Sequence, residues 1–341
     1  MATIRDVAKS SGVSIATVSR VLNKKGKYSK QTENRVYQAV EELGYTLNLT
    51  ARSLKTGLTG TIGLGIQEYY LTHFPHLVST LLRVLKENGF SVEAIPGGDL
   101  KTCRMLLAEG RFDGLLIIEP QKEQLALRKM IEEGGRFVVL GGDIEREDVN
   151  MVEIDYFLGG YITAKKLIHQ GHRQVLFIEE NPQLYFTREI KRGFLYAMDE
   201  NGIPFDPELI LQANHKSTAC GEYTGYRSVK QLVHKFPFTA VLATEDRIAY
   251  GVLKAAEEED LPVPDRLSVI GFGNTSTSAF VKPPLTTVEA PLSQMGELGA
   301  EILVNNIKRK DRIIKRVKLN INMIERATTS TSPHSKGLKL V

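Results

Sequence analysis

Residues 1–23 read MATIRDVAKSSGVSIATVSRVLN, and this stretch decides the character of the N-terminal domain. Thr3 with Asp6 can start a helix, Gly12 can end it in the left-handed conformation, and Ser14 can cap a second helix. Apolar residues recur at helical spacing on both sides of the glycine, at Ile4, Val7 and Ala8 and at Val18, Val21 and Leu22. The stretch therefore predicts a helix-turn-helix.

The second predicted helix has an outward face that suits the major groove of DNA. Its valines and leucine point inward, which leaves a short polar face with one cation, made up of Ile15, Ala16, Thr17, Ser19, Arg20 and Asn23. An arginine can read guanine, and a small apolar side chain can contact the thymine methyl group. A solvent-exposed helical hairpin without a ligand is the alternative that this stretch alone leaves open.

Further signals extend the helical head to residue 46. The polar, basic loop over 24–28, which contains Lys27, is well placed to contact phosphates. Ser29 can cap a third helix, whose apolar side is predicted to comprise Val36, Tyr37, Val40 and Leu43. We expect residues 1–46 to form an all-α DNA-binding domain.

Residues 47–58 are expected to form a hinge helix or linker. Asn48 or Thr50 can cap one or two helical turns, and Gly57 can end them. A helix of that length is marginally stable alone in water, so it needs a partner to stay folded. A plain linker is the alternative.

The charge of the chain is concentrated in its head. Residues 1–60 hold ten lysines and arginines against four acids, a net charge of +6, whereas the remaining residues hold 34 basic and 36 acidic side chains, a net charge of −2. A basic head on a near-neutral body is typical of a nucleic-acid-binding module attached to another domain.

After Gly60 short apolar strands alternate with amphipathic helices, in two successive series. The predicted strands span 61–66, 90–95, 114–118 and 137–140, then 175–178, 209–212, 240–243 and 267–270. This alternation is typical of parallel sheets covered by helices. We expect a bilobed α/β body over 59–327, made of two parallel-sheet subdomains, with a ligand cleft at the carboxyl ends of the strands.

The C-terminal part of the chain is expected to reconnect the lobes. Residues 283–288 are predicted to cross back toward the first lobe, and a helix over 291–308 follows them. Residues 328–341 lack hydrophobic periodicity and are expected to form a flexible, frayed tail.

Composition and motifs exclude several classes of protein. The 341 residues contain no apolar run long enough to cross a bilayer and no apolar N-terminal segment of a signal peptide. Cys103 and Cys220 have neither metal-ligand nor disulfide spacing, which fits a reducing cytoplasm. His73 and His76 lack a third ligand, and no nucleophile motif stands out, so we expect no metal, no cofactor and no enzymatic activity.

The motifs together resemble the lactose/galactose repressor (LacI/GalR) family. The resemblance covers roughly residues 2–327 and is carried by TIRDVA at 3–8, GVS at 12–14, TVSRVLN at 17–23, Ala51 with Leu54, Asp155 with Gly160, GH at 171–172, SVIGF at 268–272 and PLTTV at 284–288.

The resemblance implies a homodimer whose two second helices read the half-sites of a pseudo-palindromic operator. It gives base-reading roles to Ile15, Ala16 and Arg20, and its Ile-Ala pair is closer to galactose-type repressors than to the lactose repressor. Residues 48–56 become a hinge helix that folds on DNA, with Leu54 wedged into the minor groove. The implied DNA contacts are Thr3, Ser14, Ile15, Ala16, Thr17, Ser19, Arg20, Asn23, Lys27, Ser29, Asn48, Ala51 and Leu54.

The body resembles periplasmic sugar-binding proteins, which implies a small effector in the cleft. Ile190 stands where the family commonly has arginine, so Arg188 and Arg192 are candidate substitutes, although either can equally be a surface charge. Family members often have asparagine and aspartate where this chain has Glu245 and Asn274. The candidate effector contacts are Asp155, Arg188, Arg192, Glu245, Asn274 and Tyr69.

These observations predict a cytoplasmic transcriptional repressor of carbohydrate-utilisation genes, released from double-stranded operator DNA by a sugar-type effector such as galactose or a galactoside. One alternative is a global carbon-catabolite regulator that depends on a protein co-repressor. The other is a sugar-binding receptor or enzyme body with an incidental helical head, against which the basic head and the absent signal peptide argue.

Overall fold

The chain consists of two compact units, which join at Gly60. The computed structural model describes residues 2–22, 26–45, 57–120, 124–212, 221–308 and 313–333. Most of the predicted hinge, with Asn48, Ala51 and Leu54, lies outside these ranges, as does Asn23 at the end of the second helix.

The head contains three helices, α1 (Ile4–Ser11), α2 (Ile15–Leu22) and α3 (Lys30–Glu42). Thr3 and Asp6 form a reciprocal capping box at the start of α1, and Gly12 ends the helix with a φ of 65°. Ser14 Oγ accepts a hydrogen bond from Thr17 N at 3.1 Å, and Ser29 Oγ caps α3 in the same way. The predicted starts of the three helices and the predicted end of α1 at Gly12 are confirmed.

The core of the head is small and apolar. It is formed by Val7, Ala8, Val18, Val21, Val36 and Ala39. The predicted apolar side of α3 was partly wrong, because Tyr37 and Leu43 are 40% and 38% exposed. The inward stripe follows residues 36, 39 and 40, so position 37 lies about 100° around the helix from its centre.

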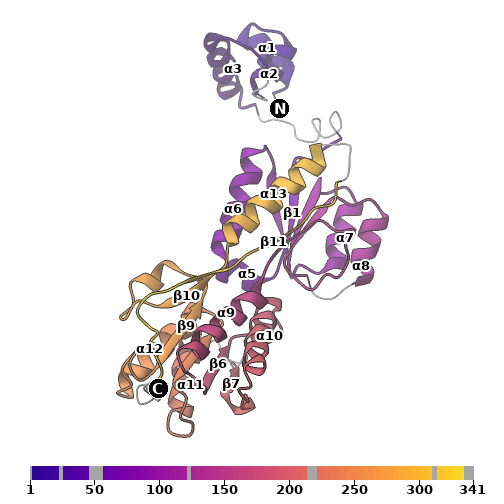
Figure 1. Ribbon diagram of the computed structural model, residues 1–341. Helices are drawn as coiled ribbons and strands as arrows, with labels where there is room; N and C mark the ends of the chain where they lie inside the picture. The colour runs from indigo at the N-terminus through magenta and orange to yellow at the C-terminus, as the bar shows by residue number, and fades with distance from the viewer. Residues whose placement is uncertain are drawn as a thin grey trace. The chain divides into compact units, whose positions relative to one another are not determined.

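The first lobe of the body contains a six-stranded sheet in the order β11-β5-β4-β3-β1-β2, in which the described pairings are parallel. Its strands are β1 (Thr61–Ile66), β2 (Ser91–Pro96), β3 (Gly114–Ile118), β4 (Phe137–Leu140), β5 (Met151–Ile154) and β11 (Arg316–Leu319). Its helices are α5 (Glu68–His73), α6 (Pro75–Glu87), α7 (Leu100–Ala108), α8 (Gln124–Glu132) and α13 (Leu292–Lys308). In Figure 1, α6 and α13 lie side by side, and α7 and α8 cover the other side of this sheet.

The second lobe contains a sheet in the order β12-β10-β9-β8-β6-β7, parallel except where β12 joins β10. Its strands are β6 (Val175–Glu179), β7 (Ile210–Gln212), β8 (Ala240–Ala243), β9 (Ser268–Phe272), β10 (Thr286–Glu289) and β12 (Asn322–Ile324). Its helices are α9 (Tyr156–His169), α10 (Tyr185–Glu200), α11 (Gly221–Leu232) and α12 (Asp246–Glu258).

Alternate residues of β6 show that helices cover both faces of the second sheet. Leu176 and Ile178 pack into the core cluster that includes residues of α11 and α12. Phe177 lies between them in sequence and packs on Phe194 of α10, with ring centroids 5.2 Å apart. Because side chains alternate along a strand, α10 lies on the opposite face from α11 and α12.

Three segments connect the lobes. The chain passes from β5 to α9, returns from β10 to α13, and passes again from β11 to β12. The predicted return to the first lobe is therefore confirmed, although residues 286–288 first complete the second sheet as part of β10. Short strands such as β5, β11 and β12 escaped prediction because four or fewer residues carry little periodicity of their own.

Close packing joins the helices of the second lobe in pairs. A Cβ atom at Gly193 would lie 2.0 Å from the carbonyl oxygen of Phe157, and one at Gly251 would lie 1.7 Å from that of Glu222. The α9–α10 and α11–α12 pairs thus approach each other at positions that only glycine can occupy.

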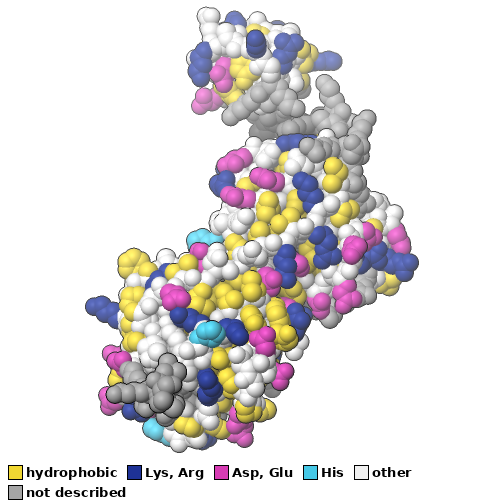
Figure 2. Space-filling model, viewed as in Figure 1, with side chains coloured by type: hydrophobic (Ala, Val, Ile, Leu, Met, Phe, Trp, Pro, Cys, Tyr) yellow, Lys and Arg dark blue, Asp and Glu magenta, His cyan; other side chains and the backbone are white. Residues whose placement is uncertain are grey.

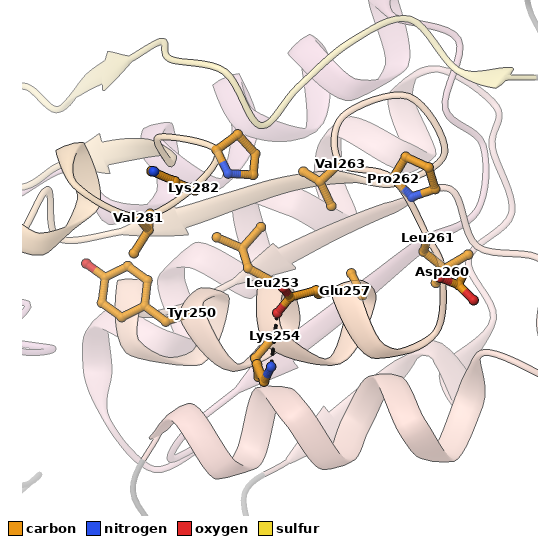
Figure 3. A pocket seen from close by; sticks show the side chains of 12 residues that line it. Tyr250, Leu253, Lys254, Glu257, Asp260, Leu261, Pro262, Val263, Val281 and Lys282 are labelled. Atoms are coloured by element: carbon orange, nitrogen blue, oxygen red, sulfur yellow. Dashed lines mark hydrogen bonds and ion pairs between the residues drawn. The ribbon is translucent and has the colours of Figure 1, made fainter.

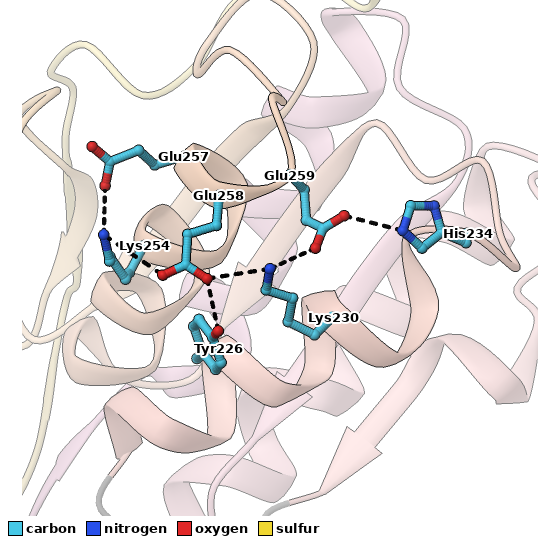
Figure 4. A network of polar contacts seen from close by, with 7 residues as sticks. All are labelled: Tyr226, Lys230, His234, Lys254, Glu257, Glu258 and Glu259. Atoms are coloured by element: carbon cyan, nitrogen blue, oxygen red, sulfur yellow. Dashed lines mark hydrogen bonds and ion pairs between the residues drawn. The ribbon is translucent and has the colours of Figure 1, made fainter.

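Ion pairs also join α11 to α12 at the surface, as Figure 4 shows. Lys230 lies 3.2 Å from Glu258 and 2.6 Å from Glu259, and the Tyr226 hydroxyl donates to Glu258 at 2.7 Å. The three consecutive glutamates 257–259 at the end of α12 are thus paired with basic side chains.

The expected frayed tail begins later than the sequence indicates. Thr328 is fully buried, and its hydroxyl donates to the carbonyl of Val269 at 2.7 Å. Ser332 N donates to the carbonyl of Gln170 at 2.7 Å. Residues 328–333 are therefore part of the second lobe, because their backbone and hydroxyl groups find partners that the sequence pattern does not show.

Candidate nucleic-acid interface and ligand cleft

The outward face of α2 carries the residues that the sequence assigns to base reading. Ile15 is 45% exposed, Ala16 and Arg20 are exposed, and Thr17 and Ser19 are half-buried. The Arg20 side chain runs beside the following loop, since a Cβ at Gly26 would lie 3.5 Å from its Cδ. An exposed isoleucine at the start of a helix contributes little to the core of the head, and it is free to contact a partner.

The predicted phosphate-contacting residues lie at helix starts and in the basic loop. Thr3, Ser14 and Ser29 cap α1, α2 and α3, and they and Lys27 are exposed. Helix N-termini carry partial positive charge and favour phosphate groups. Figure 2 shows more basic than acidic side chains on the visible face of the head. This surface has the chemistry of a DNA-binding face.

A cavity of about 340 Å³ opens between the two lobes of the body. Its lining comprises Gln67, Tyr70, Glu119, Pro120 and Asp143 from the first lobe and Asn181, Gln183, Leu184, Tyr185 and Arg188 from the second. Amides, carboxylates and a guanidinium dominate this lining, so the cavity suits a small ligand rich in hydrogen-bonding groups.

Arg188 links the two lobes across the cavity. Its Nη1 donates to the carbonyl of Gln183 at 2.7 Å, and its Nη2 lies 3.9 Å from the carboxylate of Asp143. At 3.9 Å the two groups form an ion pair and no direct hydrogen bond, so a ligand hydroxyl can still accept a hydrogen bond from this guanidinium.

Glu119 is a buried carboxyl at the same cavity. The hydroxyl of Tyr70 donates to it, and the backbone N–H groups of Tyr185 and Phe186 are close enough to favour its ionised form. Burial raises the pKa of Glu119 to about 7, while these donors and the charge of Arg188 act in the opposite direction.

An aromatic cluster adjoins the cavity and also bridges the lobes. Tyr69 of α5 donates its hydroxyl to Glu245, which precedes α12, and its ring stacks on Phe186 with centroids 6.3 Å apart. Phe74 packs edge-on against Phe186 at 5.5 Å. Burial raises the pKa of Glu245 to about 8, with the nearby carboxylate of Asp246 adding to the shift and Arg247 opposing it.

Three of the six candidate effector residues lie at or beside the cavity. Arg188 lines the cavity, and Tyr69 and Glu245 meet in the interlobe contact beside it. Their role in ligand binding stays a prediction.

Three other candidates do not line this cavity and have structural partners. Asp155 caps α9 and lies 2.8 Å from Lys318. Arg192 pairs with Glu189 and lies over the Phe157 ring, 4.5 Å from its centroid. Asn274 donates to Glu289 at 2.9 Å and accepts from Arg326 at 2.6 Å.

Several cavity residues went unnoticed in the sequence. Gln67 follows β1, Glu119 follows β3, Asn181 lies just beyond β6, and Asp143 lies just beyond β4. A usable signal was present, because polar residues directly after buried parallel strands gather at one edge of a sheet.

A second hollow, of about 660 Å³, lies on the second lobe between α12 and the segments around residues 262 and 282. Figure 3 shows Tyr250, Leu253, Val263 and Val281 along its wall. Phe280, next to this hollow in the chain, is 83% exposed. An exposed aromatic beside an apolar hollow is typical of a protein-contact surface.

Comparisons with known proteins identify the family of the chain. The family described as "Bacterial regulatory proteins, lacI family" matches residues 3–48, and that described as "Periplasmic binding protein-like domain" matches residues 164–329. The HTH-type transcriptional repressor PurR of Histophilus somni (strain 2336) is 31% identical over 340 residues, which covers 97% of this chain and 100% of the relative. The chain belongs to the lacI family of bacterial regulatory proteins. PurR of Aliivibrio fischeri (strain MJ11) is 33% identical over 318 residues, 91% of this chain and 93% of that one.

Solved structures share the fold of this lacI-family chain. The lac repressor dimer bound to operator and the anti-inducer ONPF matches with a TM-score of 0.80 at 24% identity, covering 96% of this chain and 99% of that one. The complex of the transcriptional regulator CelR with cellobiose matches with a TM-score of 0.68 at 24% identity, covering 96% and 100%. The predicted fold, a helix-turn-helix head followed by a bilobed α/β body, is confirmed.

The family also defines the class of activity. This lacI-family chain is a sequence-specific DNA-binding transcriptional repressor and not an enzyme. Repressors of the family bind operator DNA and small-molecule effectors as dimers. The relatives named above are PurR repressors, so the expected galactose-type effector stays a prediction.

Two further observations concern the described ranges only. None of their helices is long and apolar enough to cross a membrane. Their His, Cys, Asp and Glu side chains form no group of three or more that could hold a metal ion. Cys103 is buried with a free thiol, and Cys220 lies outside the described ranges.

Proposed function

We propose that this lacI-family repressor binds a pseudo-palindromic operator as a homodimer and that a small, sugar-type effector in the interlobe cavity releases it. The observation that carries this proposal is the combination, in one chain, of an exposed reading helix and a polar cavity between two lobes. A ligand that prefers one arrangement of the lobes must change operator affinity by the same coupling free energy.

Base reading is assigned to Ile15, Ala16 and Arg20. All three are exposed on one helix, and together they offer two apolar contacts for thymine methyl groups and one bidentate donor for guanine. Contacts from Thr3, Ser14, Thr17, Ser19, Asn23, Lys27 and Ser29 would hold the helix in register on the phosphates.

The hinge proposal extends the DNA-binding region to residues 47–58. On the family resemblance, Asn48 and Ala51 lie on a helix that folds beside its dimer mate, and Leu54 enters the minor groove. Inserting an apolar side chain between base pairs unstacks them and bends the duplex. We expect Leu54→Ala to weaken operator binding and to reduce bending in a gel-phasing assay, and an unchanged bend angle would contradict the wedge.

The exposed Phe280 and its neighbouring hollow support a homodimer. A two-fold interface is self-complementary, so an exposed ring on one copy needs an apolar recess on the other, and this lobe offers both. Phe280→Asp should shift the sedimentation coefficient from dimer to monomer. Tyr196→Asp, which changes an exposed aromatic residue on α10, is the control and should leave the dimer intact.

The size and chemistry of the interlobe cavity support a small polar effector. A volume of about 340 Å³ is near the lower end for small-molecule sites, which run from roughly 300 to 1,000 Å³. Its amides, carboxylates and guanidinium match the hydroxyl groups of a sugar, and the adjoining Tyr69 and Phe74 supply aromatic surface. Galactose and galactosides are the first compounds to test, and we propose that the repressor controls carbohydrate-utilisation genes in the cytoplasm.

The decisive experiment selects bound duplexes from a randomised pool and titrates a selected and a random duplex at two salt concentrations. Arg20→Ala should lower discrimination between the two duplexes by about 1–3 kcal/mol, because one bidentate base contact is lost. Lys9→Ala, which removes one exposed charge from α1, should weaken both duplexes alike. Equal weakening of both duplexes by Arg20→Ala would refute its base-reading role.

A second experiment addresses the effector. Galactose, galactosides and other mono- and oligosaccharides are screened for a rise in melting temperature, which binding to the native state produces by mass action. Compounds that stabilise the body are then added to the operator complex, and an inducer must lower operator affinity. A stabilising sugar that leaves operator affinity unchanged would contradict release by that sugar.

A further inference from the structure

Glu119 of the first lobe faces the beginning of α10 in the second lobe. The first N–H groups of a helix lack partners within it and attract negative charge. Leu184, the N-cap of α10, supplies no side-chain hydrogen bond, so this end of a 16-residue helix is uncapped by its own segment. The carboxylate of Glu119 lies across the cavity from Leu184 and Tyr185, and the N–H groups of Tyr185 and Phe186 are close enough to favour its ionised form.

The surrounding fold holds this carboxylate in place. Glu119 has a φ of 39°, a left-handed conformation that costs energy for a residue other than glycine and persists where its surroundings impose it. Gly141, just after β4, leaves room for the side chain, because a Cβ there would lie 2.9 Å from Glu119 Cγ and 3.2 Å from its Oε1. The buried Tyr70 donates to the other carboxylate oxygen, Oε2.

The other charges of the cavity are matched within the protein. Among the lining residues that the structure describes, Arg188 is the basic side chain, and it lies 3.9 Å from Asp143. An acidic ligand group would therefore meet two carboxylates, and it would have to compete with Glu119 for the start of α10. Hydroxyl and ammonium groups would instead meet acceptors.

We propose that Glu119 is a specificity-determining residue of the effector site. Its carboxylate occupies the position at the start of α10 where an acidic ligand group would bind, so the cavity accepts neutral or cationic ligands and excludes sugar acids and sugar phosphates. This inference rests on the proposed function of the cavity as the effector site, and it names the charge class of the effector.

The test uses sulfate as the probe for an acidic group. Melting temperatures of the full chain are measured at about pH 8.5, either with about 10 mM sulfate or with chloride at equal ionic strength. At these low salt concentrations the general effects of salt on stability are small. Glu119→Gln removes the charge and keeps the shape. Glu109→Gln, an exposed residue at the end of α7, is the matched control for the change in net charge.

The expected result is that sulfate raises the melting temperature of Glu119→Gln by roughly 2–5 °C over chloride, through binding to the native state. Wild type and Glu109→Gln should show no such rise. A response of wild type equal to that of Glu119→Gln, or no response of Glu119→Gln, would overturn the proposal.

A second measurement needs no substitution. Burial raises the pKa of Glu119 to about 7, so the group is neutral below about pH 6. The titratable and charged groups that face it are Tyr70, Tyr156, Tyr185, Arg188 and, across the cavity, Asp143. Sulfate, a dianion at both pH values, should then stabilise the wild type at about pH 5.5 and not at about pH 8.5, and equal responses at the two pH values would overturn the proposal.

Operator binding is measured in parallel on wild type and Glu109→Gln. Failure of the repressor proposal would appear there as a loss of preference for selected DNA, whatever the sulfate response. Failure of the Glu119 proposal would appear in the sulfate response alone.

Discussion

Removing the hydroxyl of Tyr69 tests whether the two lobes are joined by a hydrogen bond across the cleft. In Tyr69→Phe the ring can keep its stacking on Phe186, and the bond to Glu245 is lost. A hydrogen bond between neutral partners contributes about 0.5–1.5 kcal/mol to stability, and one to a charged partner about 1.5–3 kcal/mol. The free energy of unfolding should therefore fall by an amount that depends on the charge of Glu245.

The pH decides which of these magnitudes applies. Because burial raises the pKa of Glu245 to about 8, this group is largely neutral at about pH 6.5 and largely ionised at about pH 9. We expect Tyr69→Phe to lose about 1 kcal/mol at the lower pH and about 2 kcal/mol at the higher. For a body of this size each kcal/mol corresponds to roughly 2–4 °C in melting temperature.

The assay is urea unfolding of the full chain at both pH values, with Tyr161→Phe as the matched control. The hydroxyl of Tyr161 donates to Glu200 at 2.9 Å on the surface of the second lobe, where water can replace the bond. Its removal should change stability much less, and equally at both pH values. Equal losses for the two variants, or a Tyr69→Phe loss that shrinks as the pH rises, would refute the interlobe bond.

Three further changes have defined outcomes. Gly193→Ala should lower the free energy of unfolding by about 1–3 kcal/mol or more in urea titrations, because its Cβ would lie 2.0 Å from the Phe157 carbonyl oxygen, and a loss near zero would contradict the close packing of α9 and α10. The free energy of unfolding should fall as the pH rises from about 5 to about 8, because the raised pKa values of Glu119 and Glu245 keep these groups protonated in the folded state at pH values where they are ionised in the unfolded state. Replacing both residues with Gln should flatten this pH dependence in urea titrations. Ser14→Ala should speed amide hydrogen exchange in α2 by the equivalent of about 1 kcal/mol through loss of its cap, whereas exchange in α3 should not change.

The candidate site could be predicted in part. The reading face of α2 was identified because its residues are consecutive on one short helix, whose inward positions are plainly apolar. In the cleft, Arg188 was identified because it lies two residues before Ile190, where the family commonly has arginine. Glu119 and Asp143 were not identified, because the cavity that they line is completed by residues more than forty positions away in the chain, such as Arg188. Arg192 looked equivalent to Arg188 in sequence, but it lies four residues further along α10 and pairs with Glu189 at the surface.

The sequence by itself determined the local structure of this protein. Thr3, Gly12, Ser14 and Ser29 set the helix ends of the head, because a cap is a contact between residues three or four positions apart. The alternation of apolar strands and helices likewise determined an α/β body with two sheets. The tertiary structure alone decided which strand ends meet, where β5, β11 and β12 join the sheets, and that Glu119 of one lobe faces the start of α10 in the other. Those features depend on contacts between distant parts of the chain, and such contacts leave no periodic mark in the sequence.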